Sequence, residues 1–374
     1  MVIIQDGPTG LAQGVEAALA VAGRGAERAR TRYRLDSGTA RALVAAGFAR
    51  HFVPARWGGA AGGFETLVDA VLDLSGACTA AAWCATLYAA HGRLAGYLPE
   101  QGQADLWAHS PDVLIAGAGL APSGRAEAVP GGWRLSGEWG FVSGVDHAQW
   151  VLLAAWTQAR AGLEHRVFAV PRGDLLIRDT WRGLGMRGTG SNTVVLADVL
   201  VPAHRTVPMA ELAAARPPAA GRARCHQVPY RMVATLLFTT PIVGAATAAM
   251  TAWSAPPPGR VLDLQRELTR AATELRSARL LLGHAAARAD LAAPGERAVA
   301  ENLRDTSLTA DLCVTAVDRL CQLTGGVLPA DQDPVQRARQ DVHTAAGHTA
   351  LECEAASARY SDGFFDWDAA GGCC

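Results

Sequence analysis

The 374-residue sequence predicts an α+β fold in which helices and strands occupy successive stretches of the chain. Apolar residues recur at helical spacing near both ends of the chain, whereas the middle consists of short β-type runs separated by turn residues. Half of the residues are hydrophobic and 18% are charged, so the chain can bury a large core. We therefore expect an N-terminal α-helical domain (1–110), a middle β-domain (111–208), a linker (209–229) and a C-terminal four-helix bundle with a short tail (230–374).

The first helical stretch is interrupted by one Pro/Gly-rich loop. Asp36 and Ser37 can cap a helix, because apolar residues then recur at helical spacing as far as Phe48. The following segment, FVPARWGGAAGGF, is typical of a loop. Helical spacing resumes at 67–74 and continues through a largely apolar stretch that holds His91. A lone histidine in such a helix is more often a satisfied core residue than a functional one, and both interpretations stay open.

The middle region has the pattern of a compact β-domain. Its short runs are DVLIAGAGL, GGWRLSGEWGFV, WVLLAAW, RVFAVP, LLIRDTW and TVVLADVLVP. Residues 183–188, GLGMRG, match the spacing of a dinucleotide-binding loop, but such a loop must open a helix and a strand-like run follows. The segment GEWGFVSGVDHAQW (137–150) sets one hydroxyl, Ser143, among aromatic residues and glycines. That hydroxyl can satisfy a turn amide or serve a ligand.

The C-terminal region predicts an antiparallel helical bundle. Four long segments fit its helices: 230–254, 261–291, 296–324 and 334–359. Asp333-Pro334 is a favourable start for the last helix, because Asp caps free amides and Pro needs no donor in the first turn. Residues 232–253 carry no charge over a length that could cross a bilayer. Their many Ala and Thr residues, together with Pro241 and Gly244, favour a helix buried within the bundle, so we expect no membrane partner.

Composition argues against several function classes. A net charge of −1 gives no electrostatic footprint for nucleic acid. All 34 basic residues are arginine, so no lysine can form a Schiff base or a Walker-type phosphate site. The ten histidines show no metal-ligand spacing, and we expect no metal site. Eight cysteines without a C-x-x-C pair, and no secretory signal, predict a cytoplasmic protein with reduced thiols; the Cys373-Cys374 pair is expected in a solvated tail.

The last helix carries the most polar set of residues in the chain. Arg337, Asp341, Thr344 and His348 are spaced by four, three and four, so a continuous helix places them on one face. Spacing alone favours an arginine–aspartate pair on a solvated face. His348, however, extends this line into an Ala-rich segment where the face should be buried, which makes it a candidate functional residue.

Together these segments resemble the acyl-CoA dehydrogenase superfamily over nearly the whole chain. The resemblance is carried by ARHFVPARWGGAAGGF, WRLSGEWGFVSGVDHAQWVLLAAW, GLGMRGTGSNTVVLADVLVPAHR and DPVQRARQDVHTAAGH. The motif W-x-F-x-S-G, followed by D-H-x-x-W, is similar to motifs of the flavin-dependent monooxygenase branch. That branch includes the oxygenase component of p-hydroxyphenylacetate hydroxylase, dibenzothiophene monooxygenase and amino-sugar N-oxygenases.

The resemblance implies an acyl-CoA dehydrogenase-like fold and the oxygenase component of a two-component flavin-dependent monooxygenase. A separate flavin reductase would supply reduced FMN or FAD, which reacts with O2 to form a C4a-hydroperoxyflavin. The substrate would be a small electron-rich molecule, hydroxylated on an aromatic carbon or an amine nitrogen. The resemblance also implies a homotetramer.

It further implies roles for individual residues. Trp139 and Phe141 would wall a slot for the flavin ring, and Ser143 would reach its N5 atom. His91 matches a substrate-side base, and His348 a histidine beside the flavin. The other expected cofactor contacts are Arg187, Ser191 and Arg337.

Two alternatives remain open on the residues alone. An FAD-containing acyl-CoA or acyl-carrier-protein dehydrogenase needs a carboxylate base, and Glu352 and Glu354 lie just beyond His348. The second alternative is a catalytically silent scaffold of the same fold. The chain also departs from the branch at Gln340, where the resemblance leads us to expect a second arginine. Such an arginine could brace the flavin or a subunit contact.

Overall fold

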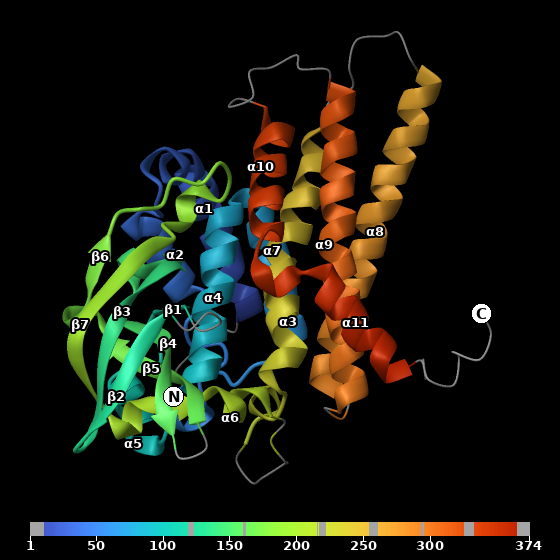
Figure 1. Cartoon of the computed structure of the whole chain (residues 1–374). Coiled ribbons are helices and arrows are strands. Elements are labelled where there is room, and N and C mark those ends of the chain that lie inside the picture. The colour runs from blue at the N-terminus through green and yellow to red at the C-terminus, as the bar shows by residue number, and fades with distance from the viewer. Residues whose placement is uncertain are drawn as a thin grey trace, which may run out of the picture.

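The computed structural model describes residues 11–118, 123–159, 162–214, 216, 222–253, 261–291, 293, 295–324 and 333–364. The strands gather at one side of the molecule and the longest helices at the other (Figure 1). Helix α4 (Thr79–Ala95) stands between them, so one helix contacts both the sheet and the bundle. The predicted Cys373-Cys374 tail lies outside the described residues.

The N-terminal part is helical, as the sequence predicts. Besides α4 it consists of α1 (Leu11–Arg32), α2 (Ser37–Ala45), α3 (Phe64–Ala77) and α5 (Glu100–Trp107), with a 3-10 turn at Ala55–Trp57 in the expected loop. The Asp36 carboxylate accepts a hydrogen bond from the Thr39 amide at 2.8 Å, which is the expected cap of α2. Nearly every side chain of α4 is buried, because helices and sheet cover it on opposite faces.

In the part of the chain that the structure describes, one eight-stranded sheet forms the middle region. Its strands are β1 (Ile115–Ala118), β2 (Gly124–Val129), β3 (Gly132–Val142), β4 (Trp150–Ala159), β5 (Gly162–Pro171), β6 (Leu176–Arg178), β7 (Asn192–Pro202) and β8 (Thr206–Pro208). They lie in the order β6-β7-β3-β2-β4-β5-β8, and β1 pairs with β4. Antiparallel pairing sets Val142 of β3 opposite Asn192 of β7, so the ends of these strands meet. The GLGMRG loop ends in a 3-10 turn (Arg187–Thr189) and leads into strand β7, not into an α-helix.

The C-terminal part contains α7 (Tyr230–Ala252), α8 (Val261–Leu291), α9 (Glu296–Thr324), α10 (Pro334–Ala346) and α11 (Cys353–Phe364). The prediction of one final helix over 334–359 is wrong, because α10 stops before Gly347 and a 3-10 turn (Thr349–Leu351) precedes α11. At this break Nδ1 of His348 accepts the Ala350 amide and caps the turn. The expected linker also holds structure of its own, a short α6 (Met209–Ala213) and a 3-10 turn (Arg224–His226).

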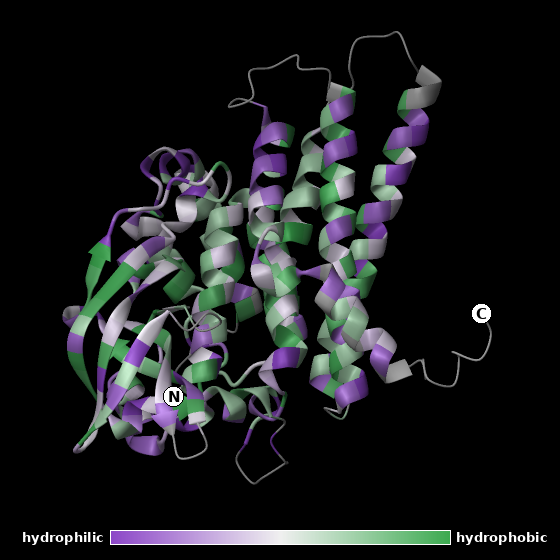
Figure 2. Ribbon diagram, viewed as in Figure 1, coloured by the Kyte–Doolittle hydropathy of each residue, from purple (hydrophilic) through white to green (hydrophobic). Residues whose placement is uncertain are grey.

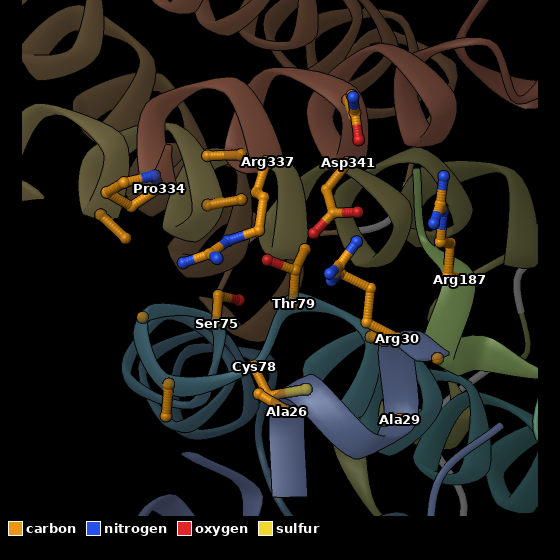
Figure 3. Close-up of a pocket in the computed structure, with 18 of the residues that line it drawn as sticks. Ala26, Ala29, Arg30, Ser75, Cys78, Thr79, Arg187, Pro334, Arg337 and Asp341 are labelled. Atoms are coloured by element: carbon orange, nitrogen blue, oxygen red, sulfur yellow. The ribbon is translucent and has the colours of Figure 1, made fainter. Parts of the chain in front are cut away.

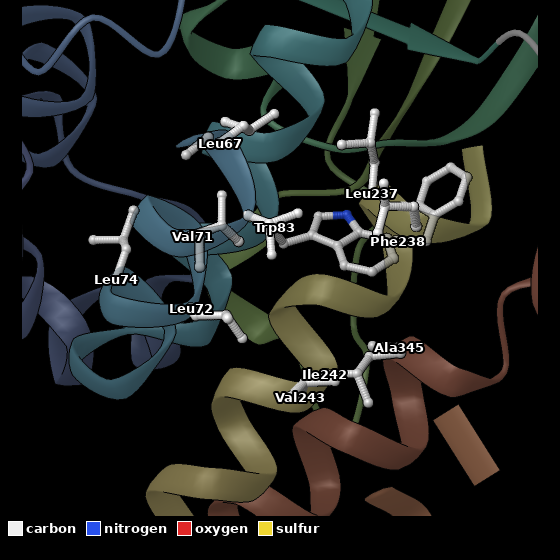
Figure 4. Packing of buried hydrophobic residues seen from close by; sticks show 14 of the residues in the cluster. Leu67, Val71, Leu72, Leu74, Trp83, Leu237, Phe238, Ile242, Val243 and Ala345 are labelled. Atoms are coloured by element: carbon white, nitrogen blue, oxygen red, sulfur yellow. The ribbon is translucent and has the colours of Figure 1, made fainter. Parts of the chain in front are cut away.

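Helix α7 is the centre of the helical core. Its side chains are mostly apolar, whereas α8, α9 and α10 carry hydrophilic residues along their length (Figure 2). Apolar residues of α3, α4, α7 and α10 pack together in one cluster (Figure 4). Among the described residues α7 is the one helix long and apolar enough to cross a membrane, and 89% of that apolar window is buried within the protein. This burial is what a core helix requires.

Candidate active site

Strands β3 and β7 bring Ser143 and Ser191 into contact. Ser143 directly follows Val142 at the end of β3, and Ser191 directly precedes Asn192 at the start of β7. Their Oγ atoms lie 2.8 Å apart. The Oγ of Ser191 lies a further 2.6 Å from Oγ1 of Thr189, and the Thr189 hydroxyl donates to the Met186 carbonyl at 2.8 Å. All three hydroxyl residues are buried. Two positions predicted separately, Ser143 and Ser191, thus belong to one chain of hydroxyl groups.

Helix α4 holds this hydroxyl chain from the other side. The indole Nε1 of Trp83 donates to Oγ of Ser143 at 3.1 Å. Five residues further along α4, the Tyr88 hydroxyl donates to the Gly144 carbonyl at 2.7 Å. Gly144 has φ +72°, and a Cβ there would lie 2.5 Å from the Tyr88 oxygen, so the turn after Ser143 requires glycine.

Trp83 also joins the hydroxyl chain to an aromatic group from the bundle. Its ring lies 5.5 Å from Phe238 of α7 and 6.0 Å from His348, measured between centroids. Figure 4 shows the indole beside Phe238. We call Trp83, Ser143, Phe238 and His348 the Trp83 cluster. Its members come from the N-terminal helices, the end of strand β3 and the C-terminal helices.

His348 is held as a neutral hydrogen-bond donor. Its Nδ1 accepts the Ala350 amide at 3.1 Å, which places the proton of the neutral ring on Nε2. Burial lowers the pKa of His348 to about 4, so the ring is uncharged at neutral pH. Because α10 ends at Ala346, His348 does not share a helical face with Arg337 and Asp341, and that part of the prediction is wrong.

His91 has the opposite tautomer. Its Nδ1 lies 3.0 Å from the Ile115 carbonyl, an acceptor, so the neutral ring must donate from Nδ1 and keep a lone pair on Nε2. Burial lowers the pKa of His91 to about 4, although the bond to Ile115 acts to raise it. Nε2 faces Gly117, where a Cβ would lie 2.9 Å from it. His91 can therefore accept a hydrogen bond at Nε2, whereas His348 can donate one from Nε2.

The two aromatic residues of the GEWGFVSG segment lie in different environments. Trp139 is fully buried in the β-domain core, and its indole N–H donates to the Ala154 carbonyl at 2.7 Å. Its predicted role in walling a flavin slot is therefore corrected to that of a core residue. Phe141 is 79% exposed, has φ +59° and meets Trp181 edge-on at 6.2 Å. A register shift between Trp139 and Val142 turns Phe141 out of the strand alternation.

Arg187 and Arg337 lie in a separate cavity of about 580 Å³. It is bordered by α1, the α3–α4 turn, α7, α10 and the loop before β7, and its charged lining residues are Glu27, Arg30, Arg187, Arg337 and Asp341. Figure 3 shows the last four of these side chains around the cavity. Arg187 donates through Nε to the Leu184 carbonyl at 3.1 Å. The lining includes none of the other predicted site residues, so these two arginines lie apart from Ser143, His91 and His348.

The polar face of α10 fastens the loop that carries the hydroxyl chain. Asp341 accepts the Met186 amide at 2.5 Å, and Oγ1 of Thr344 accepts the Gly185 amide at 3.1 Å. Burial raises the pKa of Asp341 to about 6, although the Met186 amide acts to lower it. The carbonyl of Gln340 abuts Gly185, where a Cβ would lie 2.0 Å from it. This face is thus a clamp on the loop and not the solvated arginine–aspartate pair that spacing favours.

Sequence reasoning missed Trp83, Thr189 and Phe238. A signal for Trp83 was present, because it precedes His91 by eight residues and shares a helical face with it. No comparable signal marks Phe238, since every side of α7 is apolar. The carboxylates considered for dehydrogenase chemistry, Glu352 and Glu354, are both exposed.

Comparisons with known proteins agree with the fold described above. The family model "Acyl-CoA dehydrogenase, C-terminal domain" matches residues 236–353. The FADH(2)-dependent resorcinol hydroxylase oxygenase component of Rhizobium sp. (strain MTP-10005) is 34% identical over 81% of this chain and 81% of its own length. The 3-HSA hydroxylase of Rhodococcus sp. RHA1 superposes with a TM-score of 0.87 at 26% identity, covering 94% of this chain and 96% of that one. XiaF from Streptomyces sp., solved with FADH2 and glycerol, gives 0.85 at 25% identity, covering 95% of each chain.

The helices, the sheet and the Trp83 cluster thus lie in a fold shared with flavin-dependent hydroxylases. The 34% identity over most of both chains is enough to assign the sequence to their family. The chain belongs to the flavin-dependent monooxygenases of the acyl-CoA dehydrogenase superfamily, as the oxygenase component of a two-component system.

Proposed function

We propose that the protein hydroxylates a small phenol on an aromatic carbon, with reduced FMN or FAD delivered by a separate reductase and with O2. The observation that carries the proposal is that α4 presents two functional side chains, Trp83 and His91, eight residues apart. Trp83 holds Ser143, and His91 offers a free ring nitrogen. The resorcinol substrate named for the Rhizobium relative supports a phenol.

The residues at the end of β3 fit a flavin. Phe141 is an exposed aromatic surface beside Trp181, and its positive φ is a strained conformation of the kind found at ligand sites. Ser143 lies two residues away and would meet N5 of the ring, with Ser191 behind it. Bound reduced flavin would supply the electrons that activate O2. The chain would position the ring, exclude water and, through Nε2–H of His348, donate a hydrogen bond beside it.

His91 is proposed as the base that takes the phenol proton. Its lone pair on Nε2 is available at neutral pH because the ring is neutral there, and the Ile115 carbonyl fixes the tautomer. A phenolate is a stronger nucleophile than a phenol at the ring carbon beside the oxygen. We expect loss of His91 to affect hydroxylation more than flavin binding.

Arg187 and Arg337 are proposed to meet the anionic part of the flavin. Both line the cavity that reaches Thr79, one helical turn before Trp83. Arginine suits a phosphate through charge and paired donors. We do not extend a cofactor role to Trp139.

We propose functional regions at 1–110, 111–208 and 230–374, a homotetramer and a cytoplasmic location. Exposed leucines on α8 and α9 (Leu280, Leu291 and Leu308) support association through the bundle. Buried, unpaired cysteines among the described residues support a reducing compartment.

The experiment mixes the anaerobic protein and reduced FAD with 18O2 and a panel of phenols. We expect one 18O atom in the product, and we expect His91→Ala to consume oxygen while forming little product. If no phenol gains oxygen, but an acyl-CoA reduces a tightly bound flavin, the chain is a dehydrogenase and the proposal is wrong.

A further inference from the structure

The hydrogen atoms of the hydroxyl chain can each be assigned a direction. Thr189 Oγ1 lies 2.8 Å from the Met186 carbonyl oxygen, which can only accept, so the Thr189 hydrogen lies between them. Thr189 must then accept from Ser191, 2.6 Å away, because it has no second hydrogen to give. The Ser191 hydrogen is thereby used, and Ser191 must accept from Ser143 at 2.8 Å.

At the other end of the chain, the direction is also fixed. The indole nitrogen of Trp83 can only donate, so it donates to Ser143 at 3.1 Å. Ser143 therefore receives one hydrogen bond, gives its own hydrogen to Ser191 and keeps a single lone pair. All four side chains are buried, so water does not compete freely for these bonds.

We infer that Ser191 and Thr189 are positioning residues that commit the Ser143 hydrogen to the protein, so that Ser143 can only accept a hydrogen bond from a ligand. The inference rests on the proposed position of flavin N5 at Ser143. In reduced flavin N5 carries a hydrogen and can donate to the remaining lone pair. In oxidised flavin N5 is itself an acceptor. If the Ser143 hydrogen stayed on Ser191, the lone pairs of Ser143 and of oxidised N5 would face each other. If that hydrogen rotated towards N5, Ser191 would lose its hydrogen-bond donor.

The hydroxyl chain thus makes the site selective for the oxidation state of the flavin. It favours reduced flavin through one hydrogen bond, and it disfavours oxidised flavin through one unsatisfied buried acceptor. A preference on the order of tenfold in dissociation constant corresponds to such a difference. The selective element lies in Ser191 and Thr189, which do not themselves touch the flavin.

The test is anaerobic equilibrium titration of the full-length protein with oxidised and with reduced FAD. In Ser191→Ala the Ser143 hydrogen loses its internal acceptor and can turn to oxidised N5, so oxidised FAD should bind about tenfold more tightly. Thr189→Val frees the Ser191 hydrogen, which can then donate to Ser143 and reverse the chain, with the same result. Thr189→Ser keeps the hydroxyl and should match the wild type. If Ser191→Ala fails to fold, the Thr189→Val and Thr189→Ser pair carries the test.

Ser143→Ala separates this inference from the proposed function. It should weaken reduced FAD and leave oxidised FAD nearly unchanged, the reverse of the Ser191 and Thr189 variants. If Ser143→Ala alters neither affinity, flavin N5 does not lie at Ser143 and the proposed site is wrong. If Ser143→Ala behaves as expected while Ser191→Ala and Thr189→Val bind both forms like the wild type, or weaken both equally, the inference is overturned and the proposed function stands.

Discussion

The rings of Phe238 and His348 stack with centroids 4.0 Å apart and planes inclined by 27°. This contact ties the break after α10 to the middle of α7. The Ala350 amide holds the same imidazole at Nδ1. Two elements far apart in sequence therefore fix one ring, and only its Nε2 remains for a ligand.

Replacing Phe238 should loosen His348. Phe238→Leu removes the stacked ring and should cost about 1 kcal/mol of unfolding free energy. We expect a larger share of the reduced flavin to yield hydrogen peroxide instead of product, because His348 loses its orientation. The control is Phe168→Leu, a fully buried phenylalanine in the β-domain core. Equal peroxide yields from the two variants would show that the stack does not serve the reaction.

The neutral His91 should make the fold sensitive to acid. Its pKa is about 4 in the folded chain and 6.5 in the unfolded one, so between these values the unfolded chain binds more protons. The unfolding free energy should therefore fall as pH falls from 6.5 towards 4, by up to about 3 kcal/mol from this residue. Urea unfolding of His91→Gln, which keeps a donor for Ile115, should show a shallower fall. An unchanged pH dependence would mean that His91 is not held neutral.

Phe141 and Trp139 should respond oppositely to truncation. Phe141→Ala removes an exposed ring and should change stability by less than about 0.5 kcal/mol, yet weaken flavin binding. Trp139→Ala empties a fully buried site and should cost about 3–5 kcal/mol. Chemical unfolding and flavin titration of both variants measure these effects. Unaltered flavin affinity in Phe141→Ala would remove that ring from the site.

The Asp341 clamp should act on the site through the 185–186 loop. Asp341→Asn keeps an oxygen that can accept the Met186 amide, whereas Asp341→Ala leaves that amide without a partner. The alanine variant should lose about 1–3 kcal/mol more unfolding free energy than the asparagine variant. Hydrogen exchange of the Met186 amide should be faster in Asp341→Ala alone. Similar exchange in both variants would argue that the carboxylate does not hold the loop.

Much of the fold follows from local sequence signals. The Asp36 cap, the Pro/Gly loop, the strand runs and the start of α10 at Pro334 all depend on neighbouring residues, and each was predictable. The break at Gly347 was not, because its cap is the His348 ring, whose position depends on Phe238 of α7. Local spacing cannot reveal a contact between residues more than a hundred positions apart.

The site was predictable in its residue types but not in its connections. Ser143 and Ser191 were identified separately, and only the pairing of β3 with β7 joins them. Regular strand alternation would put Trp139 and Phe141 on the same face, and both were expected at the flavin. The register shift after Trp139 separates them, and the strand pattern does not reveal that shift. Phe238 gave no signal, since an all-apolar helix marks none of its side chains for a site.

The most direct test of the proposed site compares Ser143→Ala with Ser136→Ala, an exposed serine on the same strand. The quantity to measure is the fraction of reduced flavin converted into hydroxylated product and not into hydrogen peroxide. If Ser143 meets N5 of the flavin, its removal should lower that fraction severalfold while the Ser136 variant matches the wild type. Identical fractions in all three proteins would contradict the account.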